Sequence, residues 1–255
     1  MERKKHAVVT GGAKGVGAAC CRILCREGFA VSFLDIDQAA GKALEQELSS
    51  SRYVRCDVSK AEEVSNAMAE AIHHFGEIDL LVNNAGIQLY GSITETSEEA
   101  WDRLMNINLK SYFLCAKEVI PSMQRNGKGV IINVSSVQAF ITQKSVAAYT
   151  TAKTALLGLT RSIAVDYSPQ IRSVAICPGT IDTPLLRNAL SESPDPQKVF
   201  EECEEMHLLK RVGQPEEVAE LIAFVASGKA AFMTGQAIRI DGGLGIEIAG
   251  SRREE

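Results

Sequence analysis

The 255-residue chain lacks several features that mark whole classes of protein. It has no apolar run long enough to span a membrane, and aromatic residues make up only 5% of it. Its seven cysteines form no Cys-x-x-Cys pair and its four histidines show no ligand spacing, so we expect no metal site. The apolar run from Ala7 to Val9 is too short for an export signal. These absences predict a cytoplasmic protein with free thiols and no membrane partner.

The charge balance argues against polyanionic partners. The formal net charge is −5, which offers little attraction to nucleic acid or to an anionic membrane surface. A hydrophobic content of 45% with 23% charged residues is typical of a soluble globular protein that builds a sizeable core. The predicted partner is therefore a small molecule rather than a nucleic acid or a membrane.

Short apolar, β-branched runs alternate with helical patterns along the whole chain. Strands are predicted at residues 6–10, 30–35, 53–56, 79–83, 130–135, 171–177 and 237–241. Helices are predicted at residues 15–27, 39–48, 61–75, 108–125, 146–167 and 215–227. This alternation predicts one α/β domain over residues 1–255, with a doubly wound, seven-stranded parallel sheet and helices on both faces.

The alternation breaks once, between Pro178 and about Lys210. This stretch contains four prolines and an acidic, helix-like piece at residues 199–209. Because it follows the sixth predicted strand, it lies at the carboxyl edge of the sheet, where open α/β folds bind ligands. We expect residues 179–210 to form a mobile lid over the substrate, with a solvated excursion that touches no ligand as the alternative.

A glycine-rich turn joins the first predicted strand to the first predicted helix. Gly11 permits a tight turn out of the strand. Gly15 and Gly17 permit a pyrophosphate to approach the backbone N–H groups at the helix start, next to Val16. The turn is not a P-loop, because no Gly-Lys-Ser/Thr occurs in it. The pattern predicts a dinucleotide site.

A second set of residues is suited to moving a proton. Ser136 ends the fifth predicted strand thirteen residues before Tyr149, and Lys153 follows one helical turn later. A phenol with a pKa near 10 is a poor base at neutral pH, so we expect the Lys153 ammonium to lower the pKa of Tyr149. Ser136 would hold the substrate oxygen. The set predicts acid–base catalysis of alcohol oxidation.

Together these segments resemble the short-chain dehydrogenase/reductase family along almost the whole chain. The resemblance rests on Thr10 to Gly17, Asn83-Asn84-Ala85-Gly86, Ser135-Ser136 and Tyr149-Thr150-Thr151-Ala152-Lys153. It implies a Rossmann fold, an NAD(P)-dependent oxidoreductase, and catalytic roles for Asn108, Ser136, Tyr149 and Lys153, in which Asn108 holds a water that relays the proton. One departure is the absence of a glycine three positions after Ser136, which leaves one wall of the substrate pocket undefined.

The resemblance also implies where the cofactor lies. Asp57 would contact the adenine, residues 84–86 the adenosine ribose, and residues 178–183 the nicotinamide carboxamide. The full implied set is Gly11, Lys14, Gly15, Val16, Gly17, Asp35, Ile36, Asp57, Val58, Asn84, Ala85, Gly86, Tyr149, Lys153, Pro178, Gly179, Ile181 and Thr183.

Two residues point to different cofactors. Asp35, eighteen residues after Gly17, would bind the ribose hydroxyls and repel a 2′-phosphate, which favours NAD. Lys14 favours NADP, because a basic residue just before the second glycine helps hold that phosphate in related proteins. We expect NAD. Repulsion between the Asp35 carboxylate and the dianionic 2′-phosphate costs more binding free energy than attraction by a mobile lysine on the rim of the site can offset.

The substrate is less sharply indicated. The stretch 135–186 is similar to sugar-oxidising members, the aldose and fucose dehydrogenases. Amide, hydroxyl and imidazole groups suited to several substrate hydroxyls are present at Gln88, Gln138, Gln143, Thr180 and His207. The alternatives are a 3-oxoacyl reductase, a small hydroxy-acid dehydrogenase, or a Rossmann-fold sensor or scaffold without turnover. The last is disfavoured, because such proteins typically lose the tyrosine or the lysine.

The predicted helices 108–125 and 146–167 are too apolar for the surface of a monomer. Each spreads apolar side chains over more than one face, so one face packs on the sheet and another requires a partner. The family pairs these helices between subunits about a two-fold axis. We expect a homotetramer with two-fold symmetries, or failing that a dimer.

Overall fold

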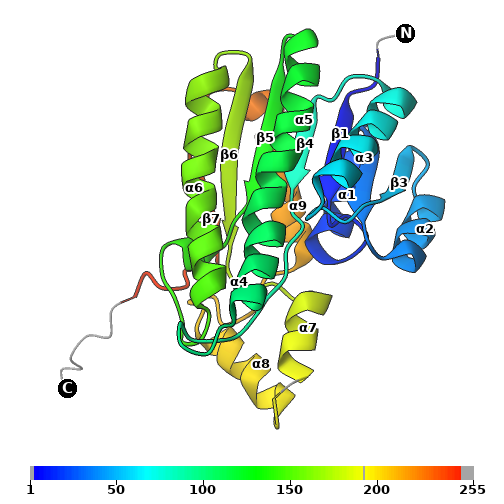
Figure 1. Cartoon of the computed structure of the whole chain (residues 1–255). Helices are drawn as coiled ribbons and strands as arrows, with labels where there is room; N and C mark the ends of the chain where they lie inside the picture. The colour runs from blue at the N-terminus through cyan, green and yellow to red at the C-terminus, as the bar shows by residue number, and fades with distance from the viewer. Residues whose placement is uncertain (1–2, 192, 248–255) are drawn as a thin grey trace.

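The computed structural model describes residues 3–191 and 193–247; residue 192 of the predicted lid and both ends of the predicted 1–255 domain lie outside the described residues. The strands are β1 His6–Thr10, β2 Ala30–Asp35, β3 Ser51–Arg55, β4 Leu80–Asn83, β5 Gly129–Val134, β6 Ile171–Pro178 and β7 Ala237–Ile240. They form one sheet in the order β3-β2-β1-β4-β5-β6-β7, and every pair is parallel (Figure 1). The predicted fold is confirmed.

Helices cover both faces of this sheet (Figure 1). One face carries α1 Gly15–Arg26, α2 Gln38–Glu47 and α9 Pro215–Ala226, and the other carries α3 Ala61–Phe75, α5 Ser111–Arg125 and α6 Ala147–Tyr167. Successive strand residues point to opposite faces, so Val9 belongs to the first core and Val8 to the second. Burial on both sides explains why the strands are nearly continuous apolar runs.

The strand order places a crevice at the centre of the carboxyl edge. The chain moves outward from β1 to β3 on one side and from β4 to β7 on the other, so the direction of winding reverses between β1 and β4. Loops that leave these two neighbouring strands diverge to opposite faces, which opens a ligand crevice between them. The glycine-rich turn after β1 and residues 84–86 after β4 both lie there.

The helix before α5 was not predicted, and the predicted start of α5 itself was wrong. An additional helix, α4 Glu98–Met105, is capped by the Ser97 side chain, which accepts a hydrogen bond from Ala100 N at 3.2 Å. It continues through a π-helical turn, Asn106–Lys110, into α5. Asn108 therefore lies in the middle of this turn and does not begin a helix. Its apolar side is formed by the buried Leu104 with Trp101 and Met105 beside it, but eight residues are too few for a helical period to be recognised in the sequence.

The segment predicted as a mobile lid, with one helix-like piece, contains two helices. It contains α7 Pro184–Ser191 and α8 Pro196–Glu205, which project beyond the carboxyl ends of the strands (Figure 1). Both helices start at a proline, whose fixed φ suits the first helical turn. The helix predicted at 199–209 was displaced, since Asp195 caps α8 through Lys198 N at 3.1 Å and the helix ends at Glu205.

All seven cysteines are free thiols. Across residues 3–191 and 193–247, no helix is long and apolar enough to cross a membrane. In the same ranges no group of three or more His, Cys, Asp or Glu side chains is arranged to hold a metal ion.

Candidate active site

The glycine-rich turn is built without room for side chains. Gly11 has φ +62°, and a Cβ there would lie 2.8 Å from Ala85 Cα. A Cβ on Gly17 would lie 2.0 Å from the Gly11 carbonyl oxygen, so α1 packs directly on the turn. The first turn of α1 thus places its backbone N–H groups at the crevice, close to the glycines of the turn.

Hydrogen bonds tie this turn to the end of β4. The Thr10 hydroxyl accepts from Asn84 N at 3.0 Å and from Ala85 N at 3.1 Å. In return, Asn84 Nδ2 donates to the Thr10 and Gly11 carbonyl oxygens at 3.0 and 3.1 Å. The two sides of the crevice therefore form one rigid unit, and Asn84 serves to hold it together.

Asp35 lies where the sequence places it, at the carboxyl end of β2. Its two carboxylate oxygens accept hydrogen bonds from Ala13 N at 3.0 Å and from Asp37 N at 2.9 Å. Lys14 is not the mobile rim lysine that was expected, because its ammonium lies 2.5 Å from a carboxylate oxygen of Asp37. Asp35, which favours NAD, thus binds backbone N–H groups, while Lys14, which favours NADP, is paired with Asp37.

The neighbouring strand ends complete this side of the crevice. Asp57 follows β3, and its Oδ1 accepts from the hydroxyl and the backbone N–H of Ser59 at 2.6 and 3.0 Å. Val58 is buried beneath it, and Ile36 after β2 is 64% exposed. An exposed apolar side chain beside a carboxylate fits the flat, polar-edged adenine that the family resemblance implies here.

On the other side of the crevice, Lys153 of α6 is buried under the site. Its ammonium donates to the Val134 carbonyl oxygen at 2.9 Å and lies 3.5 Å from the Tyr112 hydroxyl. It also lies 5.6 Å from the centre of the Tyr149 ring. Burial lowers the pKa of Lys153 to about 8. Asn108 is buried nearby, as a Cβ at Gly86 would lie 3.6 Å from its Oδ1 and 3.7 Å from Lys153 Nζ.

The ionisation of Tyr149 differs from the expectation. Burial raises the pKa of the phenol to about 12, and a hydrogen bond with Ser136 is the contact that lowers it, not the Lys153 ammonium. The reason is geometric, since Lys153 is drawn toward the Val134 carbonyl. Ser136 is beside the phenol, whereas the Ser135 hydroxyl donates to the Lys153 carbonyl oxygen at 2.7 Å.

The segment after β6 crosses the crevice toward the glycine-rich turn. Pro178 ends the strand, and Gly179 N donates to the Ile240 carbonyl oxygen at 3.0 Å. Ile181 is held by a bridge to Gly213. A Cβ on Gly15 would lie 3.2 Å from Thr183 Cγ2, so the base of the predicted lid touches the turn.

The five predicted substrate residues do not form one group. The Gln88 amide nitrogen is buried without a hydrogen-bond partner among the described residues. Gln138 accepts from the Thr150 hydroxyl at 3.4 Å, and Gln143 is exposed on a loop. His207 is buried, its Nε2 accepts from Thr180 N at 3.2 Å, and its Nδ1 donates to the Cys203 carbonyl oxygen at 2.7 Å, so both ring nitrogens bind the protein itself.

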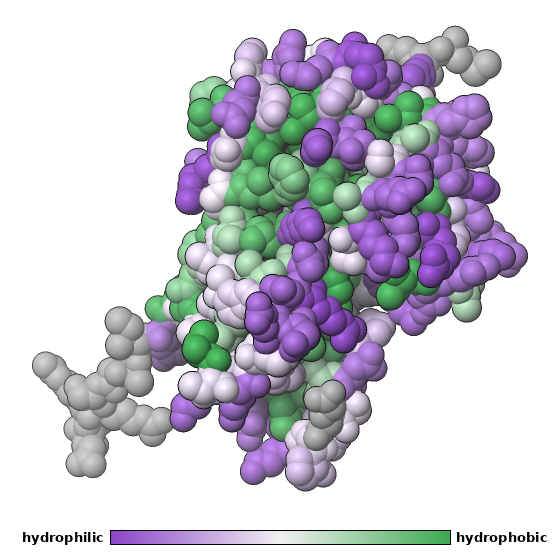
Figure 2. All heavy atoms as spheres, in the orientation of Figure 1, coloured by the Kyte–Doolittle hydropathy of each residue, from purple (hydrophilic) through white to green (hydrophobic). Residues whose placement is uncertain are grey.

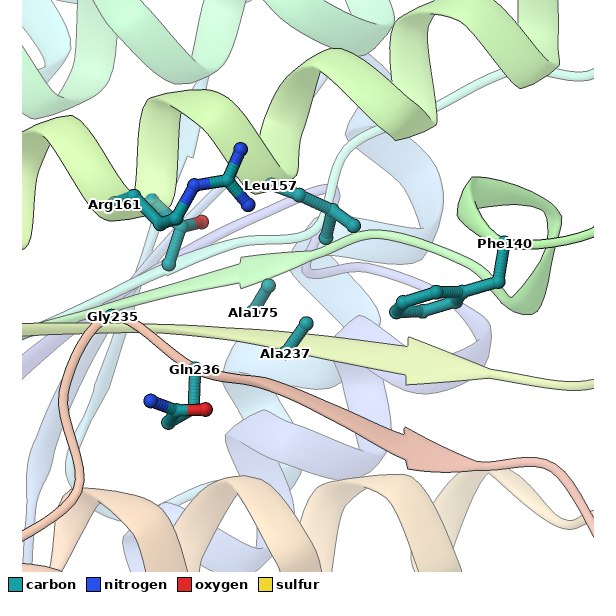
Figure 3. A pocket seen from close by; sticks show the side chains of 8 residues that line it. Phe140, Leu157, Arg161, Ala175, Gly235, Gln236 and Ala237 are labelled. Carbon is teal, nitrogen blue, oxygen red and sulfur yellow. The ribbon is translucent and has the colours of Figure 1, made fainter.

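Two hollows lie away from Tyr149 and Ser136. One, of about 330 Å³, lies between α6 and the edge strand β7 and is lined by Phe140, Leu157, Thr160, Arg161, Ala175, Gly235, Gln236 and Ala237 (Figure 3). The other, of about 90 Å³, lies under the lid base and includes Thr180 and His207 in its lining. Neither is lined by the candidate catalytic residues, so neither carries the chemistry.

Two tyrosines at the site, Tyr112 and Tyr90, were not predicted from the sequence. Tyr112, four residues after Asn108, donates to the Val134 carbonyl oxygen at 3.0 Å and lies beside Lys153. Tyr90 lies close enough to Tyr149 for its phenol to raise the pKa of Tyr149. Tyr112 could have been found from its position one helical turn after Asn108. Tyr90 lies in a loop, where no regular spacing relates it to the other site residues.

Comparison with known proteins agrees with this geometry. Residues 11–245 match the model of a family described as enoyl-(acyl carrier protein) reductase. The chain is 36% identical over 241 residues to an L-fucose dehydrogenase of Oryctolagus cuniculus, covering 94% of this chain and 84% of that protein. It is 36% identical over 249 residues to 2-(S)-hydroxypropyl-CoM dehydrogenase 3 of Xanthobacter autotrophicus, covering 95% and 98%.

A solved structure extends the agreement to the fold. Aldohexose dehydrogenase of Thermoplasma acidophilum superposes with a TM-score of 0.92 at 39% identity, covering 99% of this chain and 98% of that one. The resemblance seen in the four sequence segments is thereby confirmed over nearly all of the chain. This protein belongs to the short-chain dehydrogenase/reductase family and is an NAD(P)-dependent oxidoreductase that acts on a CH–OH or carbonyl group.

Proposed function

We propose that this oxidoreductase oxidises a hydroxyl group of a polyhydroxylated small molecule, an aldose or a close analogue, with NAD as the preferred cofactor. The proposed substrate class is supported by the identity of 36–39% to a fucose dehydrogenase and an aldohexose dehydrogenase over nearly the whole chain. The placement of Asp35 carries the cofactor preference.

The crevice fits a nicotinamide dinucleotide. Gly11, Gly15 and Gly17 leave a cradle that a Cβ would obstruct, and the first turn of α1 faces it with backbone N–H groups. Asp35 keeps both carboxylate oxygens on one side of the crevice and has lone pairs left for the ribose hydroxyls. A 2′-phosphate would face this carboxylate at close range, which disfavours NADP.

When bound, the dinucleotide supplies the hydride acceptor and a positively charged ring. The chain supplies the proton path. Ser136 holds the substrate oxygen, and Tyr149 takes the hydroxyl proton as the C–H bond breaks. With its pKa raised by burial, the phenol is protonated at neutral pH in the protein alone, so the base form requires additional positive charge around it. The Lys153 ammonium, 5.6 Å from the centre of the Tyr149 ring, supplies part of this charge.

Two side chains on the loop after β4 suit a hydroxylated substrate, and one of them, Tyr90, lies close enough to Tyr149 to raise its pKa. The orphaned Gln88 amide N–H requires an acceptor, and a sugar hydroxyl provides one. Tyr90, on the same loop, is 55% exposed and presents both an aromatic face and a hydroxyl. The loop is held in place by Gly91 N, which donates to the Ser145 carbonyl oxygen at 2.7 Å just before α6.

A small hydroxy acid or hydroxyalkyl thioether is the second candidate substrate. The relative named 2-(S)-hydroxypropyl-CoM dehydrogenase, at 36% identity over 95% of this chain, favours it. A 3-oxoacyl reductase is less well supported, because the candidate substrate residues Gln88 and Gln138 carry amides, whereas an acyl chain requires a broad apolar wall.

We further propose a homotetramer in the cytoplasm. Hydrophobic side chains gather on the face formed by α5 and α6 (Figure 2), and Phe113 and Val165 there are 51% and 80% exposed. An exposed apolar face of this kind favours a self-complementary two-fold contact. The hollow beside β7 lies along a second free edge of the sheet and gives room for a second contact (Figure 3).

The test is a comparison of kcat/KM for purified protein with NAD and with NADP over aldoses, small hydroxy acids, and 3-hydroxyacyl thioesters. We expect the highest value for an aldose with NAD, and a narrower NAD preference in Asp35→Ala. A higher value for any of the other substrates would reject the sugar assignment, and a wild type that prefers NADP would reject the cofactor assignment.

A further inference from the structure

The cofactor edge of the sheet carries two basic side chains that could attract a phosphate, and a carboxylate holds each of them. Lys14 precedes α1 and lies 2.5 Å from Asp37. Arg55, paired in register with Asp35 on the adjacent strand, lies 4.0 Å from Glu63. Positive charge at this edge is therefore engaged within the protein rather than offered to a ligand.

Asp37 is itself held firmly in position. It is the N-cap of α2, and its Oδ1 accepts from Ala40 N at 3.0 Å while its Oδ2 contacts Lys14. Its backbone N–H donates to the Asp35 carboxylate at 2.9 Å. The cap and the backbone contact fix the Asp37 carboxylate beside the ribose-binding carboxylate, so the flexible Lys14 chain is the partner that adapts.

We propose that Asp37 is a cofactor-specificity residue: its carboxylate holds the Lys14 ammonium in an ion pair, so that Lys14 does not present its charge to a 2′-phosphate. This inference rests on the proposed preference for NAD and adds a second component to it. Asp35 repels the phosphate directly, and Asp37 withholds the cation that would otherwise compensate.

The ion pair shifts the pKa of both Lys14 and Asp37 toward the charged form. Contact with Asp37 raises the pKa of Lys14, and the Ala40 N–H and the Lys14 ammonium lower the pKa of Asp37. Both groups therefore stay charged throughout the physiological range. Because the Lys14 and Asp37 side chains are 55% and 34% exposed, the pair is open to solvent and its strength falls with added salt.

The test is a double-mutant cycle read by nucleotide binding instead of turnover. Dissociation constants of NADH and NADPH are measured by titration for the wild type, Asp37→Asn, Lys14→Met and the double variant. Asparagine keeps the helix cap while removing the charge. Asp195→Asn is the matched control, because Asp195 caps α8 in the same way through Lys198 N at 3.1 Å.

We expect Asp37→Asn to tighten NADPH binding by about tenfold and to change NADH binding by less than about twofold. Lys14→Met alone should leave NADPH binding nearly unchanged, but in the Asp37→Asn background it should remove the gain. Asp195→Asn should alter neither dissociation constant.

Two results would overturn the inference: no gain in Asp37→Asn, or a gain of the same size without Lys14, which would make Asp37 a direct repulsive charge. A wild type that binds NADPH more tightly than NADH would instead contradict the proposed cofactor preference. The two failures are therefore distinguishable within one set of titrations.

Discussion

Asn108 and Ile87 form a pair of hydrogen bonds that run in opposite directions. The Asn108 amide oxygen accepts from Ile87 N, and its nitrogen donates to the Ile87 carbonyl oxygen, each at 2.8 Å. This clamp joins the π-helical turn before α5 to the loop that leaves β4. Because Lys153 and Gly86 lie beside it, the clamp fixes one wall of the site. The Asn108 side chain is thus a positioning group, and any water it holds must use its remaining N–H or its backbone.

Replacing Asn108 with Asp should therefore damage both stability and turnover. The variant keeps the shape of the side chain but places a carboxylate oxygen against the Ile87 carbonyl oxygen in a fully buried position. We expect a loss of about 2–4 kcal/mol in the free energy of unfolding, measured by denaturant titration. Asn188→Asp, at an exposed position on α7, should be nearly neutral. Equal stability of the two variants would refute the clamp.

Lys153→Met should separate stability from function. Burial lowers the pKa of Lys153 from 10.5 to about 8 in the folded protein, so below pH 8 folding carries the cost of a buried charge. As pH rises from 8 toward 10.5, the unfolded chain binds more protons than the folded one, and wild-type stability rises. We expect Lys153→Met to unfold at higher denaturant concentration than the wild type at pH 7.

For the same variant, that stability difference should shrink toward pH 10, while turnover and NAD affinity should both fall. Chemical denaturation at several pH values and nucleotide titration provide the check. A variant that is less stable than the wild type at pH 7, or whose stability difference does not change with pH, would show that burial of the ammonium costs nothing.

Acid should destabilise the protein through His6. The ring is fully buried, its Nδ1 donates to the Gly76 carbonyl oxygen at 2.9 Å, and its Nε2 accepts from the Ser32 hydroxyl at 2.9 Å. Burial lowers its pKa from 6.5 to about 4. Between pH 6.5 and 4, His6 is protonated in the unfolded chain but neutral in the folded protein. The free energy of unfolding therefore falls by about 1.4 kcal/mol per pH unit as the pH decreases.

His6→Gln should flatten this part of the pH dependence. The exposed His73→Gln on α3 should leave it unchanged, and denaturant midpoints measured from pH 7 to pH 4 give the comparison. If both variants track the wild type over this range, His6 is not the source of the acid sensitivity.

The face formed by α5 and α6 should be the principal contact between subunits. Glutamate at both Phe113 and Val165 places charge in an apolar contact and should reduce a tetramer to a smaller species. Light scattering should give about four times 27.5 kDa for the wild type. Ile93→Gln, at an apolar position 72% exposed on another loop, should retain the wild-type mass. A wild-type mass of a single chain would exclude the assembly altogether.

Much of the architecture could be predicted because it depends on regular patterns. The seven strands follow from buried apolar runs such as that of β1, and Gly11 and Gly17 from backbone positions where a side chain would collide. Boundaries set by local caps were harder to predict. Ser97 caps the start of α4, and Asp195 caps the start of α8. Neither residue changes the pattern of apolar residues from which the helices were predicted.

Interactions between segments far apart in the sequence explain the other differences between the expected and the observed contacts. The spacing of four residues predicts that Lys153 lies near Tyr149. It cannot predict that the Lys153 ammonium donates to the Val134 carbonyl oxygen, which belongs to a different strand. Lys14 was expected to be mobile, because its partner Asp37 lies on a different strand–helix connection. His207 has a polar side chain, which suggested a substrate contact, yet the structure uses both ring nitrogens to hold the lid base to Thr180 and Cys203.

The proton-transfer role of Tyr149 is the central claim, and Tyr149→Phe tests it most directly. Removal of one hydroxyl should lower kcat at least a hundredfold while leaving the folded state and NADH binding intact. Tyr167→Phe, on the same helix α6, controls for loss of a phenol elsewhere. Turnover of the best substrate and the NADH dissociation constant are measured for all three proteins. We expect that only Tyr149→Phe loses turnover, and wild-type kcat in Tyr149→Phe would contradict the proton-transfer role of this phenol.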